Sequence, residues 1–130
     1  MYIIGELKYS SLKQGIGYLK LQYNREDITS LIQRAEKTFN VKLKGDDVHV
    51  SIVRDEPIPF KKYWNKHKEP VGIQIFCDEI FNDGRFYWVD VSCNYIDLIR
   101  EELGLKRKTE LPLHLTLGQS YKNTIISSNI

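Results

Sequence analysis

The chain has 130 residues, a hydrophobic fraction of 42% and a formal net charge of +2, which together predict one folded domain and exclude an intrinsically disordered protein. No apolar run reaches the roughly 18 residues of a membrane span, and the N-terminus lacks the basic start of a signal peptide. We therefore expect a cytoplasmic protein without a membrane partner. The charge is too small to indicate a nucleic-acid partner by itself.

The first half of the chain predicts a strand followed by a capped helix. Residues 16–23 alternate as a half-buried strand does, with leucines on one face and Tyr18 and Lys20 on the other. Asn24 stands in an N-cap position and Asp27 in the capping-box position that goes with it. The helix that follows carries one apolar stripe: Ile28, Leu31, Ile32, Ala35 and Phe39. The N-terminal dozen residues are expected to add an edge strand.

The middle of the chain predicts a turn, two strands and a loop. A Gly-Asp-Asp turn at residues 45–47 leads into a strand over residues 48–53, and a further strand is predicted over residues 71–77. Between them, the loop over residues 54–69 contains the segment 60–68, FKKYWNKHK, in which four lysines are mixed with aromatic residues. Such a segment suits contacts with phosphates and bases, and equally suits a solvated surface loop.

The second half repeats the order of the first. An Asn-Asp-Gly turn at residues 82–84 is expected to join the strand before it to a strand over residues 85–92 as a hairpin. Trp88 and Asp90 lie on the non-core face of this strand. The last strand is predicted over residues 111–118. Between these strands, a second Asn-started helix has an apolar stripe and a glycine placed to end it: Asn94, Ile96, Ile99, Leu103 and Gly104.

These elements predict a single α+β domain over residues 1–130, with a loose C-terminal tail from about residue 121. Each half runs strand, helix, strand. The repeat predicts two pseudo-symmetric lobes of antiparallel sheet with flanking helices around a central groove.

The strands that end the two halves carry the same short motif. In V-H-V-S-I-V the period of two sends the aliphatic residues to the core and His49 and Ser51 to the opposite face, and L-H-L-T-L-G does the same for His114 and Thr116. For an average composition, two of three histidines fit this pattern by chance roughly once in ten thousand sequences. We expect the two strands to face each other across a groove. A lone histidine is usually a polar residue facing water, and this interpretation is kept for His67.

The sequence predicts no metal site and no cofactor. Metal clusters need cysteines and histidines in closely spaced pairs, which the chain lacks, and its carboxylates do not gather around the motif strands. The two cysteines, Cys77 and Cys93, fall within apolar alternating runs. They are interpreted as buried thiols in a protein of a reducing compartment.

The two H-Φ-[ST]-Φ motifs, which begin at His49 and His114 and are separated by a strand-and-helix repeat, resemble those of the 2H phosphoesterase superfamily. The resemblance covers the chain from about Gly17 to Gly118 and implies the LigT-like fold. The superfamily includes LigT-like RNA phosphodiesterases and viral enzymes that destroy 2′-5′ oligoadenylates or cyclic oligonucleotide signals. In its compact size the chain is most similar to phage anti-CBASS nucleases, which cleave cyclic di- and trinucleotides.

This resemblance implies a metal-independent phosphodiesterase in which His49 and His114 are the catalytic residues. One histidine acts as general base and the other as general acid, which suits imidazole because its unperturbed pKa is about 6.5. Ser51 and Thr116 are expected to bind the non-bridging phosphate oxygens. In a ribonucleotide 3′-5′ linkage the neighbouring 2′-OH serves as nucleophile. The spacing leaves open which histidine is the base.

Further residues are candidates for substrate contacts. Tyr18, Lys20 and Trp88 share the non-core faces of the first strands of the two halves, where a lysine would meet a phosphate and a ring would meet a base. Trp64 belongs to a loop that is long enough to act as a lid. Arg54, just past the first motif, is a phosphate candidate. For each of these residues a plain solvent-facing or packing role is the alternative.

The predicted partner is a small nucleotide substrate, either a cyclic oligonucleotide or an RNA end, with no obligate protein partner. A cyclic messenger as substrate implies viral evasion of host CBASS-type immunity in the host cytoplasm. The alternatives are a 2′,3′-cyclic phosphodiesterase, a 2′-5′ RNA or oligoadenylate phosphodiesterase and, from another class, a non-catalytic RNA- or nucleotide-binding module. The two complete motifs count against the last alternative, because binding alone does not need two matched acid–base groups.

Overall fold

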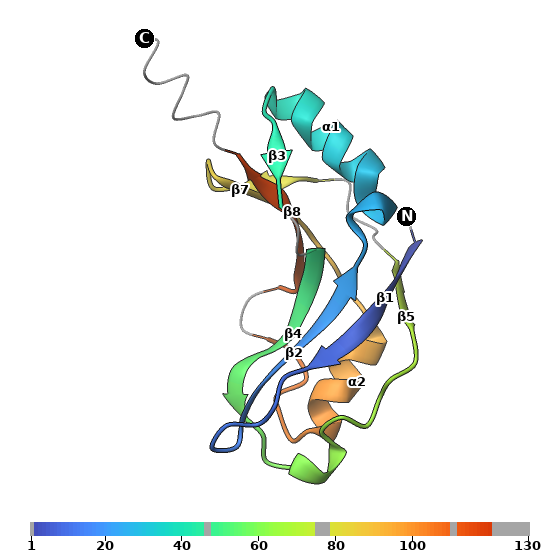
Figure 1. Cartoon of the computed structure of the whole chain (residues 1–130), viewed down its shortest axis with the longest axis vertical. Helices are drawn as coiled ribbons and strands as arrows, with labels where there is room; N and C mark the ends of the chain where they lie inside the picture. The colour runs from blue at the N-terminus through green and yellow to red at the C-terminus, as the bar shows by residue number, and fades with distance from the viewer. Residues whose placement is uncertain (1, 46–47, 75–78, 110–111, 121–130) are drawn as a thin grey trace.

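The computed structural model describes residues 2–45, 48–74, 79–109 and 112–120, and these residues form an α+β protein. One antiparallel sheet curls into a half-barrel, and two α-helices pack against it (Figure 1). The predicted α+β class is confirmed. The predicted C-terminal tail and the centre of the first predicted turn lie outside the described residues.

The described part of the sheet has the strand order β5-β1-β2-β4-β8-β7-β6, with β3 paired to β8 off this path. Every pairing among these strands is antiparallel. The strands are β1 (Tyr2–Tyr9), β2 (Ile16–Tyr23), β3 (Leu43–Lys44), β4 (Val48–Pro57), β5 (Val71–Gln74), β6 (Phe81–Asn82), β7 (Phe86–Asp90) and β8 (His114–Ser120). The helices are α1 (Thr29–Phe39) and α2 (Asn94–Glu102), with short 3₁₀ turns η1 (Arg25–Ile28) and η2 (Lys61–Tyr63).

The hydrophobic pattern located most of the strands. The strand predicted over residues 16–23 is β2, and those over 48–53, 85–92 and 111–118 correspond to β4, β7 and β8. Their ends differ by a few residues, as is usual for boundaries taken from a pattern. The largest difference is in β4, which runs on to Pro57 and so shortens the predicted loop.

Three local expectations are wrong. Strand β1 is not an edge strand, because β5 pairs with its outer side. The Asn-Asp-Gly turn at residues 82–84 joins β6 to β7, while β5 pairs elsewhere. Neither predicted cap forms with its side chain: Asn24 precedes η1 without a side-chain hydrogen bond, and Asn94 is the first residue of α2, where its Oδ1 accepts a hydrogen bond from Arg107.

The two halves of the chain share one backbone plan, and each helix packs on the central strand of the other half. The first half is β2, α1 and β4, and the second is β7, α2 and β8. Helix α1 lies beside β3 and β8 in Figure 1, and α2 contacts β4. Arg25 of η1 donates to the Leu117 carbonyl at 3.0 Å, and Arg100 of α2 donates to the Ile52 carbonyl at 2.7 Å. Each lobe is therefore tied to the other by a hydrogen bond from an arginine to a strand carbonyl.

Both motif strands contain an irregularity at the same place. The register between β2 and β4 skips Ile52, and the register between β7 and β8 skips Leu117. Each extra residue comes three positions after a motif histidine, His49 or His114. Bulges of this kind raise the local twist and redirect side chains, and they are common next to functional sites. The matched positions support a structural repeat of the two halves.

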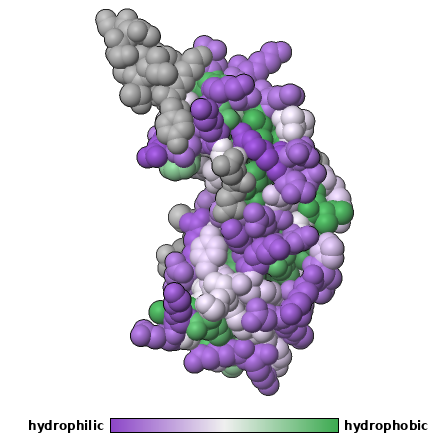
Figure 2. Space-filling model, in the orientation of Figure 1, coloured by the Kyte–Doolittle hydropathy of each residue, from purple (hydrophilic) through white to green (hydrophobic). Residues whose placement is uncertain are grey.

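The core lies between the sheet and the helices. Its largest fully buried side chains include Leu19, Leu21, Ile28, Ile52, Ile73, Ile96, Leu103, Leu115 and Leu117. Burial of one such side chain contributes about 1.5–3 kcal/mol relative to exposure. Because the aliphatic positions of β4 and β8 turn into this core, the alternate positions open on the other face of the sheet. Figure 2 shows the surface hollowed on the left, between the part that carries β7 and the part that carries β4.

Candidate functional site

The two motif strands lie side by side at the centre of the sheet. Strands β4 and β8 pair antiparallel at Val50 and Leu115. One step along each strand therefore places each motif histidine opposite the hydroxyl residue of the other motif, on one shared face. The expectation that the two strands face each other across a groove is wrong, since they are hydrogen-bonded neighbours in one sheet. All four motif side chains nevertheless lie on one face of the sheet.

The neighbouring strands extend this arrangement into two rows across the sheet. On β2, Lys20 lies opposite Ser51, and on β7, Asp90 lies opposite His114. The first row is Lys20, Ser51, His114 and Asp90, and the second is Gln22, His49, Thr116 and Trp88. Adjacent side chains in such a row have Cβ atoms about 4.5–5.5 Å apart. A ligand lying on this face can therefore contact groups from all four strands.

Tyr18 connects the two residues of the first motif. Its hydroxyl lies 2.5 Å from Ser51 Oγ and 3.3 Å from His49 Nε2. The Tyr18 and His49 rings meet edge to face, with centroids 6.5 Å apart. The structure thus brings this predicted substrate-contact residue directly to a motif histidine, where it orients both polar groups of the motif.

Arg54 has the corresponding position at the second histidine. Its Nη2 lies 3.0 Å from His114 Nε2. A guanidinium only donates hydrogen bonds, so Nε2 is the acceptor and the imidazole in this contact is neutral. Burial lowers the pKa of His114, and the charge of Arg54 lowers it further, while a backbone hydrogen bond at Pro112 and the carboxylate of Asp90 oppose the shift. These contacts favour the neutral form of the His114 imidazole, which can accept a proton.

A pocket of about 520 Å³ with aromatic walls opens on the β7 side of His114. Its lining includes Phe81, Phe86, Trp88 and Asp90. The Phe81 and Trp88 rings stack with centroids 6.3 Å apart, and the Trp88 and His114 ring centroids are 6.2 Å apart. The volume lies within the range of roughly 300–1,000 Å³ that is usual for small-ligand sites. This pocket offers a base a flat ring to stack on.

A second pocket of about 520 Å³ opens on the β4 side of His114 and has basic residues in its walls. Arg54, Arg100, Lys106 and Lys108 are among its lining residues. The sequence-based site did not include the two lysines, although a signal was present. They belong to a run of three basic residues between the end of the second predicted helix and the second motif strand.

Trp64 is not part of the site. It is buried on the core face, where its Nε1 donates to the Ser10 carbonyl at 2.8 Å and its ring packs edge to face with Tyr9 at 5.0 Å. A Cβ on Gly17 would lie 2.7 Å from the Trp64 ring, so this glycine makes room for the indole. The predicted role of Trp64 in a substrate-binding lid is therefore wrong, because the ring closes one end of the core.

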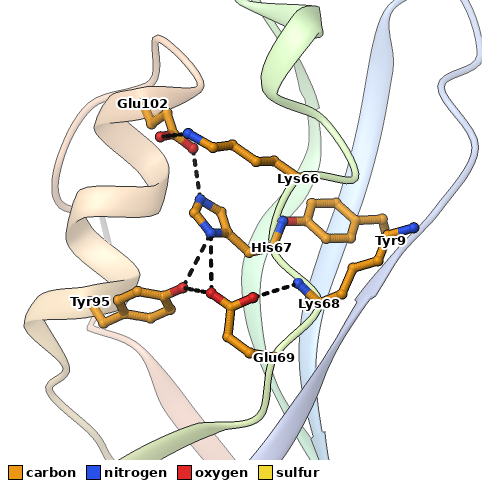
Figure 3. A network of polar contacts seen from close by, with 7 residues as sticks. All are labelled: Tyr9, Lys66, His67, Lys68, Glu69, Tyr95 and Glu102. Carbon is orange, nitrogen blue, oxygen red and sulfur yellow. Dashed lines mark hydrogen bonds and ion pairs between the residues drawn. The ribbon is translucent and has the colours of Figure 1, made fainter.

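The third histidine is a structural residue, and the expectation that it simply faces water is wrong. The side chain of His67 is 18% exposed, and its Nε2 lies 2.8 Å from Glu102 Oε1 on α2 (Figure 3). Its Nδ1 lies 3.3 Å from the hydroxyl of Tyr95 and 3.6 Å from a carboxylate oxygen of Glu69. Lys66 shares Glu102 at 2.8 Å. This network holds the lysine-rich loop against α2.

Within the described ranges, no group of three or more histidine, cysteine or acidic residues is placed to hold a metal ion. Cys93 is a free thiol just before α2 and is half-buried, so it is less buried than predicted, while Cys77 lies outside the described residues. Among the helices that the structure describes, none is long and apolar enough to cross a bilayer.

Comparisons with known proteins assign the chain to no family. No protein-family model, no curated protein and no solved structure matches the chain. The resemblance to 2H phosphoesterases therefore stays a prediction from the two motifs, and function has to be argued from the geometry of this site.

Proposed function

We propose that the protein is a metal-independent phosphodiesterase that acts on small nucleotides, with His114 as general base and His49 as general acid. The observation that supports this most directly is the pairing of β4 and β8, which sets two histidines and two hydroxyls on one face. Two imidazoles on either side of a phosphate can remove one proton and supply another in the same step. Each positioned proton transfer typically contributes about 10²–10⁴-fold to the rate.

The phosphate in this proposal lies between the two histidines. Ser51 and Thr116 donate hydrogen bonds to its non-bridging oxygens, where negative charge increases in the transition state. In the free protein the guanidinium of Arg54 is already 3.0 Å from His114. When a phosphate binds, we expect this guanidinium to move to a phosphate oxygen, because charged pairs of this kind are among the stronger hydrogen bonds. That movement leaves His114 Nε2 available to the nucleophile.

For a ribonucleotide 3′-5′ linkage, His114 and His49 together account for both proton transfers of the proposed step. His114 Nε2 takes the proton of the 2′-OH, and the 2′ oxygen forms a bond to phosphorus. The bond from phosphorus to the 5′ oxygen breaks, and His49 gives that oxygen a proton. The products are a 2′,3′-cyclic phosphate and a free 5′-OH. His114 is assigned as the base because burial and Arg54 lower its pKa and so favour its neutral form.

The aromatic pocket supports a nucleotide as the substrate. The rings of Phe81 and Trp88 adjoin His114, so a base stacked there would belong to the nucleoside that contacts the general base. Stacking of a base on an aromatic ring is worth about 1–3 kcal/mol. The size of the site favours cyclic oligonucleotides or similar small messengers as substrates. If the substrate is such a messenger, the proposed biological role is viral evasion of CBASS-type immunity. RNA ends with a 2′,3′-cyclic phosphate are the second candidate, and the basic pocket beside the site favours them.

A turnover assay in the presence of EDTA tests the proposal. The panel holds 3′,3′- and 2′,3′-linked cyclic dinucleotides, cyclic trinucleotides, 2′-5′ oligoadenylate and 2′,3′-cyclic mononucleotides. We expect cleavage of at least one compound by the parent protein, and its loss in both His49→Ala and His114→Ala. His67→Ala is the matched control, because this histidine lies in the loop network away from the site. Cleavage that neither substitution reduces would overturn the assignment, and binding without turnover would support the non-catalytic module instead.

A further inference from the structure

The basic pocket contains a positive charge, that of Lys106, which the proposed cleavage step does not use. Arg100 is paired with Glu56, and Lys108 is paired with Asp97, so both of these cations are engaged within the protein. Arg54 and Lys106 are exposed. In the described ranges 2–45, 48–74, 79–109 and 112–120, no ion pair joins either of these two to a carboxylate. Lys106 is therefore available for an anionic ligand, and Arg54, which contacts His114, lines the same pocket.

The aromatic pocket and the basic pocket share His114 and Pro112 in their walls. The two pockets therefore adjoin each other at His114. If a nucleoside places its 2′-OH at His114 Nε2 and its base toward Trp88, its 5′ carbon can extend toward the β4 side. The group attached there would enter the pocket lined by Arg54 and Lys106.

We propose that the basic pocket binds a second phosphate, the 5′-phosphate of the nucleoside whose 2′-OH attacks the scissile bond. This inference rests on the proposed function and narrows its substrate class to nucleotides with phosphates on both sides of one ribose. Cyclic dinucleotides and 5′-phosphorylated ribodinucleotides meet this requirement. A 2′,3′-cyclic mononucleotide with a free 5′-OH does not.

The physical basis is the combination of space and charge. A volume of about 520 Å³ is larger than one phosphate requires, so the pocket accommodates the phosphate with its sugar carbon and bound water. Lysine provides a compact charge that binds phosphate from a flexible stem, and arginine provides a planar fork. Arg54 lies between the two phosphate positions, because it contacts His114 and also lines the basic pocket. Lys106 is then the residue that contacts the second phosphate and not the first.

The experiment compares ribodinucleotides of the four bases, each with and without a 5′-phosphate. We expect the 5′-phosphate to raise kcat/KM about tenfold in the parent protein, which corresponds to one charge-assisted contact. In Lys106→Ala the ratio of the two kcat/KM values should fall toward one, and in Lys106→Glu it should fall below one. Arg107→Ala is the matched control: it removes a charge from the same run, but this side chain binds Glu101 and Asn94 on α2. The control should keep the tenfold ratio.

A binding measurement separates this inference from the proposed function. The dissociation constants of the same dinucleotides are measured by calorimetry with His49→Ala protein, which lacks the proposed acid and keeps both pockets. Tighter binding of the 5′-phosphorylated forms, lost when Lys106→Ala is added, would support the second phosphate site even if the parent protein shows no turnover. Equal affinities with and without the 5′-phosphate, together with turnover by the parent protein, would overturn the inference and leave the proposed function standing.

Discussion

The half of the site on β4 and the half on β8 have the same backbone and different neighbours. In each half a histidine is followed two residues later by a hydroxyl residue and three residues later by a bulge. The histidine on β4 has a tyrosine hydroxyl beside it, since Tyr18 lies 3.3 Å from His49 Nε2. The histidine on β8 has a guanidinium at 3.0 Å and an indole ring at 6.2 Å between centroids, from Arg54 and Trp88.

This difference shows how a repeated backbone can support two distinct chemical roles. The repeat accounts for the common geometry, because equivalent strands present equivalent positions to one face. The neighbours then differentiate the histidines. Burial lowers the pKa of His114 and the charge of Arg54 lowers it further, which favours the neutral imidazole, whereas the group beside His49 is a tyrosine hydroxyl that can donate or accept a hydrogen bond. The following predictions test whether the two halves really differ in function.

The largest expected effect is on catalysis. We expect His49→Ala and His114→Ala each to lower kcat by about 10²–10⁴-fold. The double variant should lose little more than either single variant, because residues that act as one unit are not additive. Steady-state kinetics on the preferred substrate measures this. If only one of the two variants lost activity, the two-histidine account would fail.

The second prediction compares the loss of stability when either of two arginines is removed, each of which donates a hydrogen bond to a strand of the other half. Arg100 is buried, is paired with Glu56 and donates to the Ile52 carbonyl, so Arg100→Ala should lower the free energy of unfolding by about 3 kcal/mol. Arg25 is only half-buried and donates to carbonyls at Leu43 and Leu117, so Arg25→Ala should cost about 1–2 kcal/mol. Urea unfolding provides both values. A larger loss for Arg25 would contradict this ranking.

The third effect separates binding from chemistry. Trp88→Ala should raise KM about tenfold with little change in kcat, because it removes the stacking surface of the aromatic pocket. Tyr18→Phe should instead lower kcat several-fold with little change in KM, because the hydroxyl orients the first motif. Should both substitutions change only KM, the distinction between the two sides of the site would be lost.

The smallest effect is a shift in pH dependence. The charge of Arg54 lowers the pKa of His114, so in Arg54→Ala that pKa should rise toward its ordinary value of about 6.5. A base with a raised pKa is protonated at higher pH, and the acidic limb of the kcat/KM profile should therefore move to higher pH. Arg54→Lys keeps the charge and should keep most of the limb in place. A shift to lower pH would contradict the role given to Arg54.

Local pattern was enough to predict most of the strands and the direction of their side chains. The period of two in β4 and β8 separated the motif histidines from the aliphatic core, and the structure bears this out at Val50 and Leu115, which are fully buried. The strand partners were not predictable in the same way. The pairing of β4 with β8 joins residues far apart in the chain, and no local signal specifies such a contact.

The errors have a common physical origin in tertiary packing. Trp64 and His67 stand in a polar, lysine-rich segment, and composition alone suggested a solvated loop or a lid. Their surroundings come from β1, whose Tyr9 packs on the indole, and from α2, whose Glu102 binds the imidazole. Lys106 was missed although it precedes His114 by only eight residues, because the sequence alone does not show that this basic run lines a pocket beside His114.

The pH profile of kcat/KM for the parent protein and the two histidine variants is the sharpest test of acid–base catalysis by His49 and His114. We expect a bell-shaped profile for the parent protein. The residual activity of His114→Ala should lose the acidic limb, because the base is gone, and that of His49→Ala should lose the alkaline limb, because the acid is gone. A parent profile that is flat between about pH 5 and 8, or variants that keep both limbs, would contradict acid–base catalysis by this pair.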